Sequence, residues 1–544
     1  MSNGHFEVPF PVNEPVLDYA PGSPERAALQ AELKRQSNRV VDIPARIGGR
    51  KVRTGKLVNA VMPHNHAHVV GRWHKCGKKE VDRAIKASLD AHAAWSSMPW
   101  QHRAAIFLKA ADLLAGPYRH VMNAATMLGQ SKTAHQAEID AACEMIDFFR
   151  FNAFYMQQVY SEQPGSSEGC WNMVEHRPLE GFVFAVTPFN FTSIAGNLPT
   201  APALMGNVAI WKPASSSMLS AHYVMELLEE AGLPGGVINF VPGGGAAIGD
   251  PVIASPDLAG IHFTGSTRVF KQMWKTVGDN IDRYKYYPRI VGETGGKDFV
   301  FAHKSSDVDA LVTALVRGAF EFQGQKCSAA SRAYIPKSLW PRVQKKLVAE
   351  IEKIKVGDPA DFTNFMGAVI DRNAYDSITK YISYAKRSKD AKILCGGNYS
   401  ARTGYFIEPT VVLAKKPDFK LMQEEIFGPV LTIYVYNDKQ LDKALTLCDQ
   451  GSPYALTGAI FGQDREALVY MMDRLTHAAG NFYINDKPTG AVVGQQPFGG
   501  GRASGTNDKA GSYLNLIRWV SPRTIKETFV PPKSVAYPYM GSDD

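Results

Sequence analysis

Short apolar, β-branched runs alternate with helical segments from Gly181 onward, and this alternation limits the chain to few folds. The first series predicts buried strands at 181–190, 207–213, 236–243 and 258–266, with helices at 217–232 and 267–280. Strands and helices that alternate at this spacing predict βαβ units, in which helices cover both faces of a parallel sheet. The fold class is therefore expected to be α/β.

A second series of the same kind starts near Pro288. It predicts strands at 289–301, 332–336, 407–413, 430–436, 456–461 and 481–486, with helices at 307–322 and 339–355. The chain has 544 residues, and single compact cores stop growing at roughly 250–300 residues. The two series therefore predict two α/β domains.

The segments outside the two series predict a helical lead-in and a projecting arm. Apolar side chains recur every three or four positions within 80–151, which indicates helices. Residues 170–181 carry strand-type side chains, and 515–530 are strand-like after a loop, 501–512, that is too polar for a core. We expect these two strands to pair and form an arm that contacts another subunit.

Composition excludes several classes of function. Lys and Arg number 60 against 52 Asp and Glu, a net charge of +8 without a long basic block, so no nucleic-acid partner is indicated. The six cysteines lie far apart without a C-x-x-C pattern, which indicates reduced thiols. No stretch reaches the ~18 apolar residues that a membrane span requires. Residues 1–15 match neither a secretory signal nor a transit peptide.

A run of histidines raises the question of a zinc site. His64, His66 and His68 would share one face of a strand, and His74 and Cys76 follow. Structural zinc usually needs closely paired thiolates, and catalytic zinc often uses a helix that also bears a glutamate; neither pattern is present. We therefore expect a polar strand here and no metal.

Cys327 follows the predicted helix 307–322, among small polar residues and next to Lys326. Two interpretations stay open: a small buried apolar side chain, or a nucleophile. A neighbouring cation and free backbone amides lower the pKa of a thiol and favour the thiolate that attacks carbon. The second interpretation therefore predicts a lowered pKa for Cys327.

Two polar residues stand where predicted strands end. Glu293 lies among glycines, which would let its carboxylate move toward the substrate and away again, as a general base must. The alternative is a solvent-exposed acid in a loop. Asn190 offers an amide to an oxyanion at a strand's carboxyl edge, where α/β sheets bind ligands; the alternative is a turn-forming asparagine. G-x-G-x-x-G is absent, and phosphate could still bind the backbone amides at the helix start after 263–266; the alternative is a turn that only connects strand and helix.

Seven short motifs occur together in one order: TPFNF (187–191), WKP (211–213), FTGS (263–266), GETGGK (292–297), GQKCSAASR (324–332), EEIFGPV (424–430) and QQPFGG (495–500). In this order and spacing they resemble the aldehyde dehydrogenase superfamily over roughly Asn38 to Thr528. Within the superfamily, the stretches 137–153, 201–213, 324–332, 481–490 and 495–509 are similar to the branch that oxidises L-glutamate γ-semialdehyde.

The resemblance implies a Rossmann-type NAD-binding domain, an α/β catalytic domain and a projecting β-strand oligomerisation arm. The implied boundaries are 1–163 for the helical lead-in and first part of the NAD-binding domain, 164–180 for the oligomerisation strand, 181–296 for the Rossmann-type NAD-binding core, 297–510 for the catalytic domain, and 511–544 for the oligomerisation arm and tail.

The resemblance also implies a mechanism. The Cys327 thiolate attacks the aldehyde, the Asn190 side chain and the Cys327 amide hold the oxyanion, and Glu293 activates the water that hydrolyses the thioester. Ser215 stands where many NAD-selective relatives carry a glutamate, so NAD is expected with some tolerance of NADP. The implied NAD contacts are Thr187, Lys212, Gly265, Ser266, Thr267, Arg268, Val269, Glu425 and Phe427.

By the same resemblance, the substrate's α-carboxylate is anchored by Ser328 and the loop 488–491, where Ala491 follows Gly490 in place of a serine common in relatives. Phe191 and Phe498 would flank the aliphatic chain. Glu144 either approaches the aldehyde or a water molecule, or is a solvated helix acid. Lys326 either draws in the anionic end of the substrate or is a surface lysine.

The implied reaction is the NAD-dependent oxidation of L-glutamate γ-semialdehyde to L-glutamate, the second step of proline catabolism. The resemblance implies a homodimer or higher homo-oligomer in the mitochondrial matrix. Three alternatives are a dehydrogenase of another semialdehyde using NAD or NADP, an esterase that uses Cys327 with Glu293, and a binding protein without catalytic activity.

Overall fold

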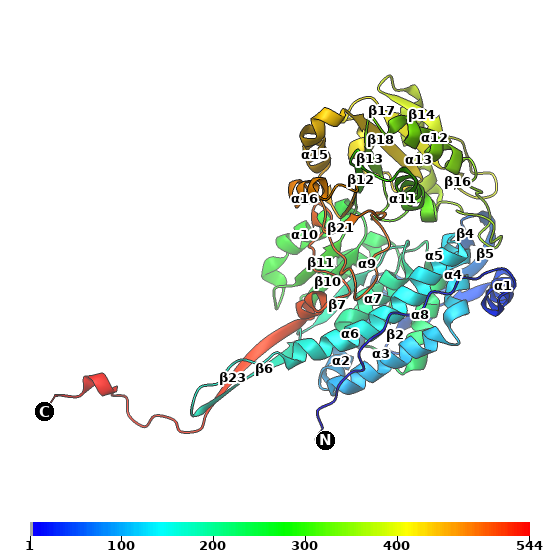
Figure 1. Ribbon diagram of the computed structural model, residues 1–544. Coiled ribbons are helices and arrows are strands. Elements are labelled where there is room, and N and C mark those ends of the chain that lie inside the picture. Colours follow the sequence, from blue (N-terminus) through cyan, green and yellow to red (C-terminus); the bar gives the residue numbers. More distant parts are fainter. Residues whose placement is uncertain (1–3, 544) are drawn as a thin grey trace.

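The computed structural model describes residues 4–543, which form two α/β lobes and an arm that projects from one of them (Figure 1). A seven-stranded sheet lies at the centre of each lobe. The predicted α/β class and its two separate sheets are therefore confirmed. No helix within residues 4–543 is both long and apolar enough to cross a membrane.

The sheet of the first lobe has the order β11-β10-β7-β8-β9-β2-β3. Neighbours from β11 to β9 are parallel, whereas β2 and β3 add an antiparallel edge from the N-terminal part of the chain. The strands are β2 (Ala45–Ile47), β3 (Arg50–Val52), β7 (Phe182–Val186), β8 (Val208–Lys212), β9 (Ile238–Phe240), β10 (Leu258–Thr264) and β11 (Arg289–Glu293). The helices that follow its central strands are α7 (Thr192–Leu204), α8 (Met218–Ala231), α9 (Gly245–Ile253) and α10 (Thr267–Asp279).

The sheet of the second lobe has the order β14-β17-β18-β13-β12-β20-β21, and only β14 runs antiparallel to its neighbour. Its strands are β12 (Phe299–Ala302), β13 (Arg332–Pro336), β14 (Ala391–Cys395), β17 (Thr410–Ala414), β18 (Val430–Tyr436), β20 (Thr457–Phe461) and β21 (Asn481–Ile484). The main helices of this lobe are α11 (Val308–Phe320), α12 (Trp340–Ile351), α13 (Arg372–Arg387), α15 (Leu441–Gln450) and α16 (Arg465–Arg474).

One predicted strand divides between the two sheets. Residues 289–301 were expected to open the second series, and this is wrong, because β11 pairs with β10 while β12 pairs with β13. The chain crosses between the lobes at Gly295 and Gly296. A Cβ on Gly295 would lie 2.3 Å from a Glu425 carboxylate oxygen, and one on Gly296 would lie 2.2 Å from the Cys327 carbonyl oxygen, so only glycine fits.

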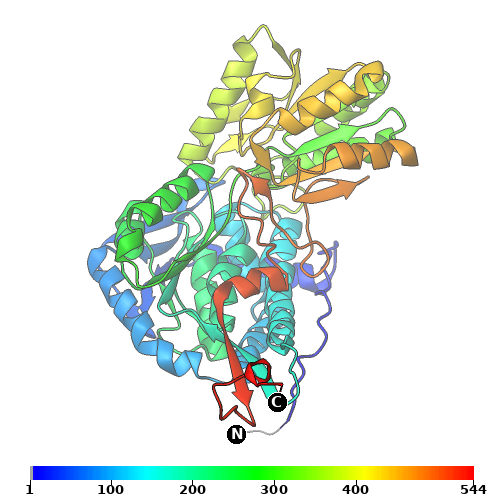
Figure 2. The same cartoon turned by 90° about the vertical axis from the view of Figure 1, so that its left-hand side faces the viewer.

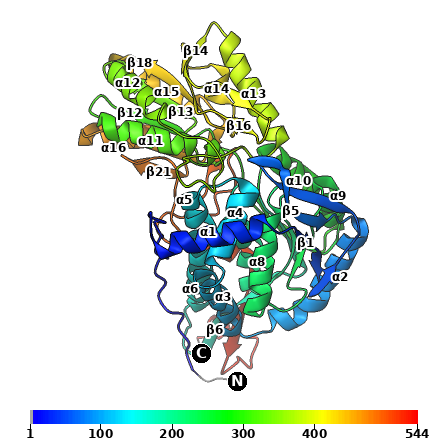
Figure 3. The same cartoon turned by 90° about the vertical axis from the view of Figure 1, so that its right-hand side faces the viewer.

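The predicted helical lead-in is confirmed. It consists of α2 (Lys78–Ser96), α3 (Trp100–Ala115), α4 (Arg119–Gln130), α5 (Ala134–Ala137) and α6 (Met145–Ser161). Between α5 and α6 the chain forms a π-helix, η1 (Glu138–Glu144), a rare element that frequently occurs at functional sites. A small sheet of β1 (Val41–Ile43), β4 (Leu57–Met62) and β5 (Asn65–His74) lies nearby, and α1 (Pro24–Ser37) packs on α4 (Figure 3).

The arm consists of β6 (Cys170–Pro178) and β23 (Val520–Thr528), which pair antiparallel along all nine residues of each strand. Strand β23, in red, extends away from the first lobe (Figure 2). The predicted pairing of these distant segments is confirmed. The expectation that the loop 501–512 is too polar for a core is wrong in part, because Ser504 is fully buried. Backbone hydrogen bonds allow this: the amide of Thr294 donates to the Ser504 carbonyl over 2.9 Å, and Gly505 forms a β-bridge with Glu293.

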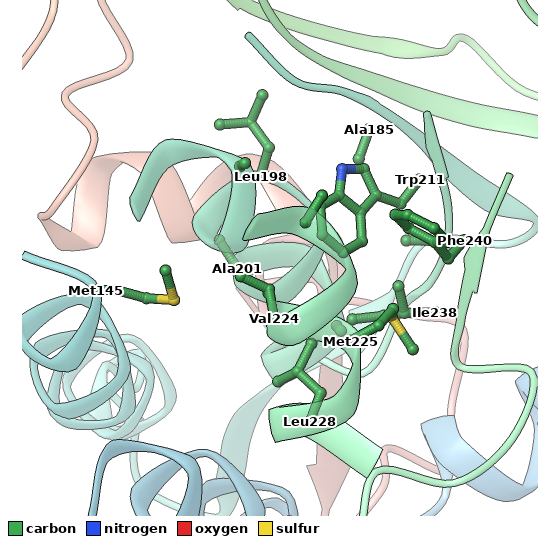
Figure 4. Close-up of a cluster of buried hydrophobic side chains, with 14 of the residues drawn as sticks. Met145, Ala185, Leu198, Ala201, Trp211, Val224, Met225, Leu228, Ile238 and Phe240 are labelled. Atoms are coloured by element: carbon green, nitrogen blue, oxygen red, sulfur yellow. The ribbon is translucent and has the colours of Figure 1, made fainter. Parts of the chain in front are cut away.

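Helices α7 and α8 pack against the first sheet through a cluster of buried apolar side chains (Figure 4). Trp211 of β8 and Phe240 of β9 meet edge to face, with ring centroids 5.1 Å apart. Leu198 of α7 and Val224 of α8 belong to the same cluster. The indole of Trp211 donates to the Thr187 hydroxyl over 2.9 Å, so the apolar core also fixes the chain just beyond β7.

Candidate active site

Segments from both lobes meet where strands of the first sheet end. Asn190 follows β7, Glu293 is the last residue of β11, and Cys327 follows α11 in the second lobe. The backbone of Gly296 lies against the carbonyl of Cys327. The Asn190 side-chain amide donates to the carbonyl of Gln325 over 3.0 Å. The three residues predicted to be catalytic therefore belong to adjoining segments.

A left-handed turn precedes Cys327. Phe322, Gln323 and Gly324 have φ values of 51°, 56° and 65°. Each non-glycine residue in this conformation costs on the order of 1–3 kcal/mol, so the surroundings must impose it. The Gln323 side chain donates to the carbonyl of Ser131 over 3.0 Å and to that of Ala368 over 2.6 Å. These contacts set the direction from which the chain reaches Cys327.

The Cys327 thiol is buried, and burial raises its pKa. The carboxyl groups of Asp298, Glu293 and Glu425 raise this pKa further. The predicted lowering of the pKa is therefore wrong. In this arrangement the protonated thiol is the form present at neutral pH.

Lys326 is not the cation that the neighbouring thiol was expected to have. Its ammonium is buried and lies 3.3 Å from the Glu321 carboxylate. Burial lowers the pKa of Lys326. The interpretation of Lys326 as a surface lysine is also wrong, and its charge is already paired with Glu321.

Glu293 occupies a glycine turn at the end of its strand. The Gly500 amide donates to its carboxylate over 3.3 Å, and a Cβ on Gly499 would lie 3.0 Å from the other carboxylate oxygen. Burial and the nearby charge of Asp508 raise the pKa of Glu293 well above its usual range. Burial in this position disfavours the ionised form of Glu293, so a base function requires that its side chain leaves the turn.

Thr187 and Lys212 lie side by side at the carboxyl ends of β7 and β8. The Thr187 amide donates to the Lys212 carbonyl over 3.2 Å. The Lys212 ammonium donates to the Pro213 carbonyl over 2.9 Å, and burial lowers its pKa to about 8. An ammonium has three donors, so two of them can serve hydroxyl groups of a ligand.

The start of α10 presents backbone amides. The Ser266 hydroxyl accepts from the Val269 amide over 3.4 Å, while the amides of Thr267 and Arg268 precede the first hydrogen bond of the helix. This positive helix end favours an anion. Gly265 leads into it, and a Cβ there would lie 2.7 Å from a neighbouring aromatic ring.

Glu425 and Phe427 approach from the second lobe. The Glu425 carboxylate accepts from the Gly296 amide over 2.9 Å and has further lone pairs for hydroxyl donors. Burial raises the pKa of Glu425. The Phe427 ring meets Phe189 edge to face at 5.9 Å. Together with Lys212 and the start of α10, this donor and acceptor set fits a dinucleotide, with a ribose at each end and a pyrophosphate between.

The predicted substrate anchor joins the segment of Cys327 to the loop 488–491. The hydroxyls of Ser328 and Thr489 bond over 2.8 Å. Gly490 has a φ of 97°, which favours glycine, and Ala491 is half-buried. The Lys487 ammonium lies 3.6 Å from the position that a Cβ on Gly490 would take. Hydroxyls, backbone amides and an ammonium at one place suit a carboxylate.

Phe191 and Phe498 are both half-buried, as side chains that border a ligand would be. Glu144 ends the π-helix and accepts from the Ser193 hydroxyl over 3.0 Å. Burial and the charge of Asp140 raise its pKa to about 8. The interpretation of Glu144 as a solvated helix acid is therefore wrong.

The histidines of the N-terminal strand bond to separate partners. His66 and His68 bond to backbone carbonyls, His74 bonds to the Asp42 carboxylate, and His64 contacts a serine hydroxyl. Within residues 4–543, no three His, Cys, Asp or Glu side chains are grouped so that they could hold a metal ion.

Comparison with known proteins agrees with this geometry. The chain matches the aldehyde dehydrogenase family over residues 51–523. The chain belongs to this family.

Similar proteins match this aldehyde dehydrogenase over nearly its whole length. Delta-1-pyrroline-5-carboxylate dehydrogenase, mitochondrial, of Dictyostelium discoideum is 54% identical over 542 residues, which are 98% of this chain and 97% of that one. Delta-1-pyrroline-5-carboxylate dehydrogenase of Agaricus bisporus is 53% identical over 536 residues, 98% of each chain. The crystal structure of the Mycobacterium tuberculosis Delta-pyrroline-5-carboxylate dehydrogenase bound with NAD has a TM-score of 0.96 and 52% identity, and covers 99% of this chain and 100% of that chain.

Some buried charged residues around the site of this aldehyde dehydrogenase were not predicted from its sequence. Asp298 accepts from the Thr457 amide over 2.7 Å, and burial raises its pKa to about 8. Its place directly after the GETGGK motif was a usable signal. Lys132 and Asp140 form a buried ion pair of 2.7 Å, for which no local sequence pattern gives a signal.

Proposed function

We propose that this aldehyde dehydrogenase oxidises L-glutamate γ-semialdehyde, the open form of Δ1-pyrroline-5-carboxylate, to L-glutamate with NAD. The observation that carries the proposal is the meeting of the Asn190, Glu293 and Cys327 segments beside the anchor formed by Ser328 and the loop 488–491. The side chains of Asn190, Glu293 and Cys327 suit an aldehyde, and the anchor suits the α-carboxylate of this substrate. The names of the similar proteins support the same substrate.

The first step is attack of the Cys327 sulfur on the aldehyde carbon, which forms a C–S bond and an oxyanion. The Asn190 amide has two N–H donors and gives one to the Gln325 carbonyl, so the second is free for the oxyanion. The Cys327 backbone N–H is the other donor. Loss of one such donor typically costs about 2.7–4 kcal/mol of barrier. Because burial raises the thiol pKa, the Cys327 proton must pass to a water molecule before or during attack.

Lys212, Glu425 and the start of α10 would hold NAD, with Thr187 and Phe427 beside it. When bound, NAD supplies the acceptor for the hydride that leaves the substrate carbon. Lys212 would donate to the adenine-side ribose, the helix start would face the pyrophosphate, and Glu425 would accept from the nicotinamide-side ribose. Ser215 is exposed and uncharged, so a 2′-phosphate meets no carboxylate at this position and NADP is tolerated in part.

Hydrolysis completes the reaction. Glu293 takes a proton from a water molecule, the water oxygen attacks the thioester carbon, and the C–S bond breaks. Glutamate leaves, and Cys327 regains its proton. The glycines around Glu293 permit the movement out of the Gly499–Gly500 turn that this role requires.

The remaining predicted residues have unequal roles in the proposal. Phe191 and Phe498 flank the aliphatic chain of the substrate. Glu144, which accepts from the Ser193 hydroxyl, is proposed to approach the aldehyde or a water molecule. Lys326 acts on the substrate only through its field, because Glu321 already holds its ammonium.

The proposal extends to assembly and location. The arm has only two strands, and Trp171 on it is 54% exposed, which supports pairing with the arm or sheet of another copy in a homodimer or higher homo-oligomer. Light scattering of a pure monomer would contradict this. The mitochondrial matrix is proposed as the location, on the support of the name of the Dictyostelium relative. Fractionation of the cells that make this chain tests it.

A panel of aldehydes with NAD tests the function. Glutamate γ-semialdehyde, succinic semialdehyde and propanal are each incubated with the protein, and NADH absorbance is followed. We expect the highest kcat/KM with glutamate γ-semialdehyde and a lower one when NADP replaces NAD. A ranking with glutamate γ-semialdehyde last would overturn the substrate assignment, and ester hydrolysis without any NAD-dependent oxidation would favour an esterase.

A further inference from the structure

A buried lysine bridges the two segments that carry Asn190 and Cys327. Lys132, two residues after α4, is completely buried, and its ammonium lies 2.7 Å from the Asp140 carboxylate of η1. The same ammonium lies 4.3 Å from the centre of the Phe191 ring and 4.5 Å from the centre of the Phe322 ring. Phe191 follows Asn190 directly, and Phe322 opens the left-handed turn that leads to Cys327.

Asp140 holds the Asn190 segment from its other side. Its oxygens accept from the amides of Thr192 and Ser193, the first residues of α7, over 3.0 and 2.9 Å, and from the Ser193 hydroxyl over 2.7 Å. Asp140 is thus the N-terminal cap of α7, supplied by another helix, because Phe191 at the cap position has no side-chain acceptor. The start of α7 fixes where Asn190, two residues earlier, presents its amide.

The neighbours of Lys132 make contacts in the same two directions. The Gln130 side chain donates to the carbonyl of Phe189, and the Ser131 carbonyl accepts from the Gln323 side chain. Gln130 and Ser131 are fully buried, like Lys132. Residues 130–132 therefore contact both the segment of Asn190 and the strained turn before Cys327.

A contribution to the free energy of unfolding does not explain why Lys132 and Asp140 are buried as an ion pair. Removing two charges from water offsets most of their attraction, so a buried ion pair adds little to the free energy of unfolding. A cation between two rings does, however, have a defined geometry, because each ring attracts it only over its face. The arrangement fixes the distance between the two rings and therefore between their segments.

We propose that Lys132, together with Asp140, is a positioning residue that holds the Asn190 amide in register with Cys327. The proposal rests on the proposed function for the roles of Asn190 and Cys327, but not on the identity of the aldehyde. Lys132 itself does not contact the substrate: Phe191 and Asn190 transmit its effect.

A double-mutant cycle with N190A tests this. K132M keeps the length of the side chain and removes the ammonium, so we expect kcat to fall roughly 10–100-fold, as for a small misplacement of a catalytic group, with KM for NAD unchanged. In the N190A background the amide to be positioned is absent, so K132M should change kcat by less than about 3-fold. Equal losses in both backgrounds would overturn the proposal.

A second readout separates this test from the substrate assignment. Acylation of Cys327 by p-nitrophenyl acetate also passes through a tetrahedral oxyanion, and it needs neither aldehyde nor NAD. The same non-additive pattern is expected in the acylation rate. If the wild type oxidised no aldehyde of the panel, the proposed function would fail while this cycle would still decide the role of Lys132.

Two further variants control for folding. K132M leaves Asp140 without its partner, whereas K132M/D140N removes both charges and retains an oxygen for the amides of α7; it should fold and show the same loss of kcat. Arg46 is a matched buried cation of the first lobe, on β2, 3.1 Å from Glu229 and 3.4 Å from Glu226. R46M should lower the melting temperature and leave kcat of the folded enzyme unchanged. An equal kcat loss in R46M, or none in K132M/D140N, would overturn the proposal.

Discussion

The two lobes position their share of the active site differently. In the first lobe, Glu293 lies at the end of β11, where the register of the parallel sheet pairs it with Thr264, and Asn190 lies in the short loop between β7 and α7. In the second lobe, Cys327 follows a helix and a left-handed turn, and the contacts that hold the turn include Ser131 and Lys132 of the first lobe. One half of the site is therefore built locally, whereas the other half depends on the lobes being assembled.

Removal of the nucleophile tests the second lobe's contribution and should have the largest effect. In C327S, kcat with glutamate γ-semialdehyde should fall by roughly 10⁴-fold or more, because a serine hydroxyl without an adjacent activated base is a far weaker nucleophile. NADH absorbance measures the loss. NAD binding by calorimetry, which depends mainly on first-lobe residues, should be unchanged. Turnover within tenfold of the wild type would show that Cys327 is not the nucleophile.

Asn190 tests the first lobe's contribution. N190A should lower kcat by about 10²–10³-fold, the usual effect of losing one oxyanion donor. N152A is a matched control, because the Asn152 amide is also buried, donates to the Asn197 side chain over 2.9 Å and lies on α6. It should reduce the melting temperature more than kcat. Equal losses of kcat in both variants would mean that Asn190 acts only through stability.

The pH dependence of the Asp298 effect tests the second lobe separately, because the Asp298 charge opposes ionisation of the Cys327 thiol in the same lobe. Burial raises the pKa of Asp298 to about 8, so it is mostly neutral below that pH and negative above it. Alkylation of Cys327 by iodoacetamide requires the thiolate and should rise with pH. The D298N and wild-type rates should coincide below about pH 8 and diverge above it, with D298N faster.

Mass spectrometry of the Cys327 peptide measures this alkylation apart from that of the other five cysteines. If the D298N profile lay at higher pH than that of the wild type, the assigned sign of the Asp298 contribution would be wrong.

The smallest effect is expected at the substrate anchor. A491S adds a hydroxyl beside Gly490, and one hydrogen bond contributes about 0.5–1.5 kcal/mol, so KM for glutamate γ-semialdehyde should fall by roughly 2–10-fold with kcat unchanged. Propanal, which has no carboxylate, is the control substrate, and its KM should not change. A similar change for both aldehydes would place Ala491 away from the carboxylate.

The same contrast explains what the sequence could predict. Short apolar runs bounded by turn residues indicate the region where a strand ends. Asn190 and Glu293 were predicted as site residues from that pattern. The ionisation of Cys327 was predicted wrongly, because Lys326 is its neighbour in sequence but pairs with Glu321 in space. The groups that raise the thiol pKa, among them Asp298, come from other segments.

The bridge between the lobes was not predictable from local pattern. Lys132 and Asp140 face each other only because the chain folds through α5 and a π-helix, and a π-helix has no sequence period that separates it from an α-helix. The glycines at the crossing, Gly295 and Gly296, can be read from the sequence. Their close contacts with the Glu425 carboxylate and the Cys327 carbonyl form only when the two lobes are assembled.

The most direct test of the proposed mechanism stops the reaction after the thioester forms and before water hydrolyses it. E293Q keeps the shape of the first lobe's carboxyl group but cannot take a proton from water. Mixed with NAD and glutamate γ-semialdehyde, it should release a burst of about one NADH per site, then turn over slowly, while a glutamyl thioester accumulates on Cys327 and is detected by mass spectrometry. Absence of the burst with Cys327 unmodified, or an adduct on another residue, would contradict the account.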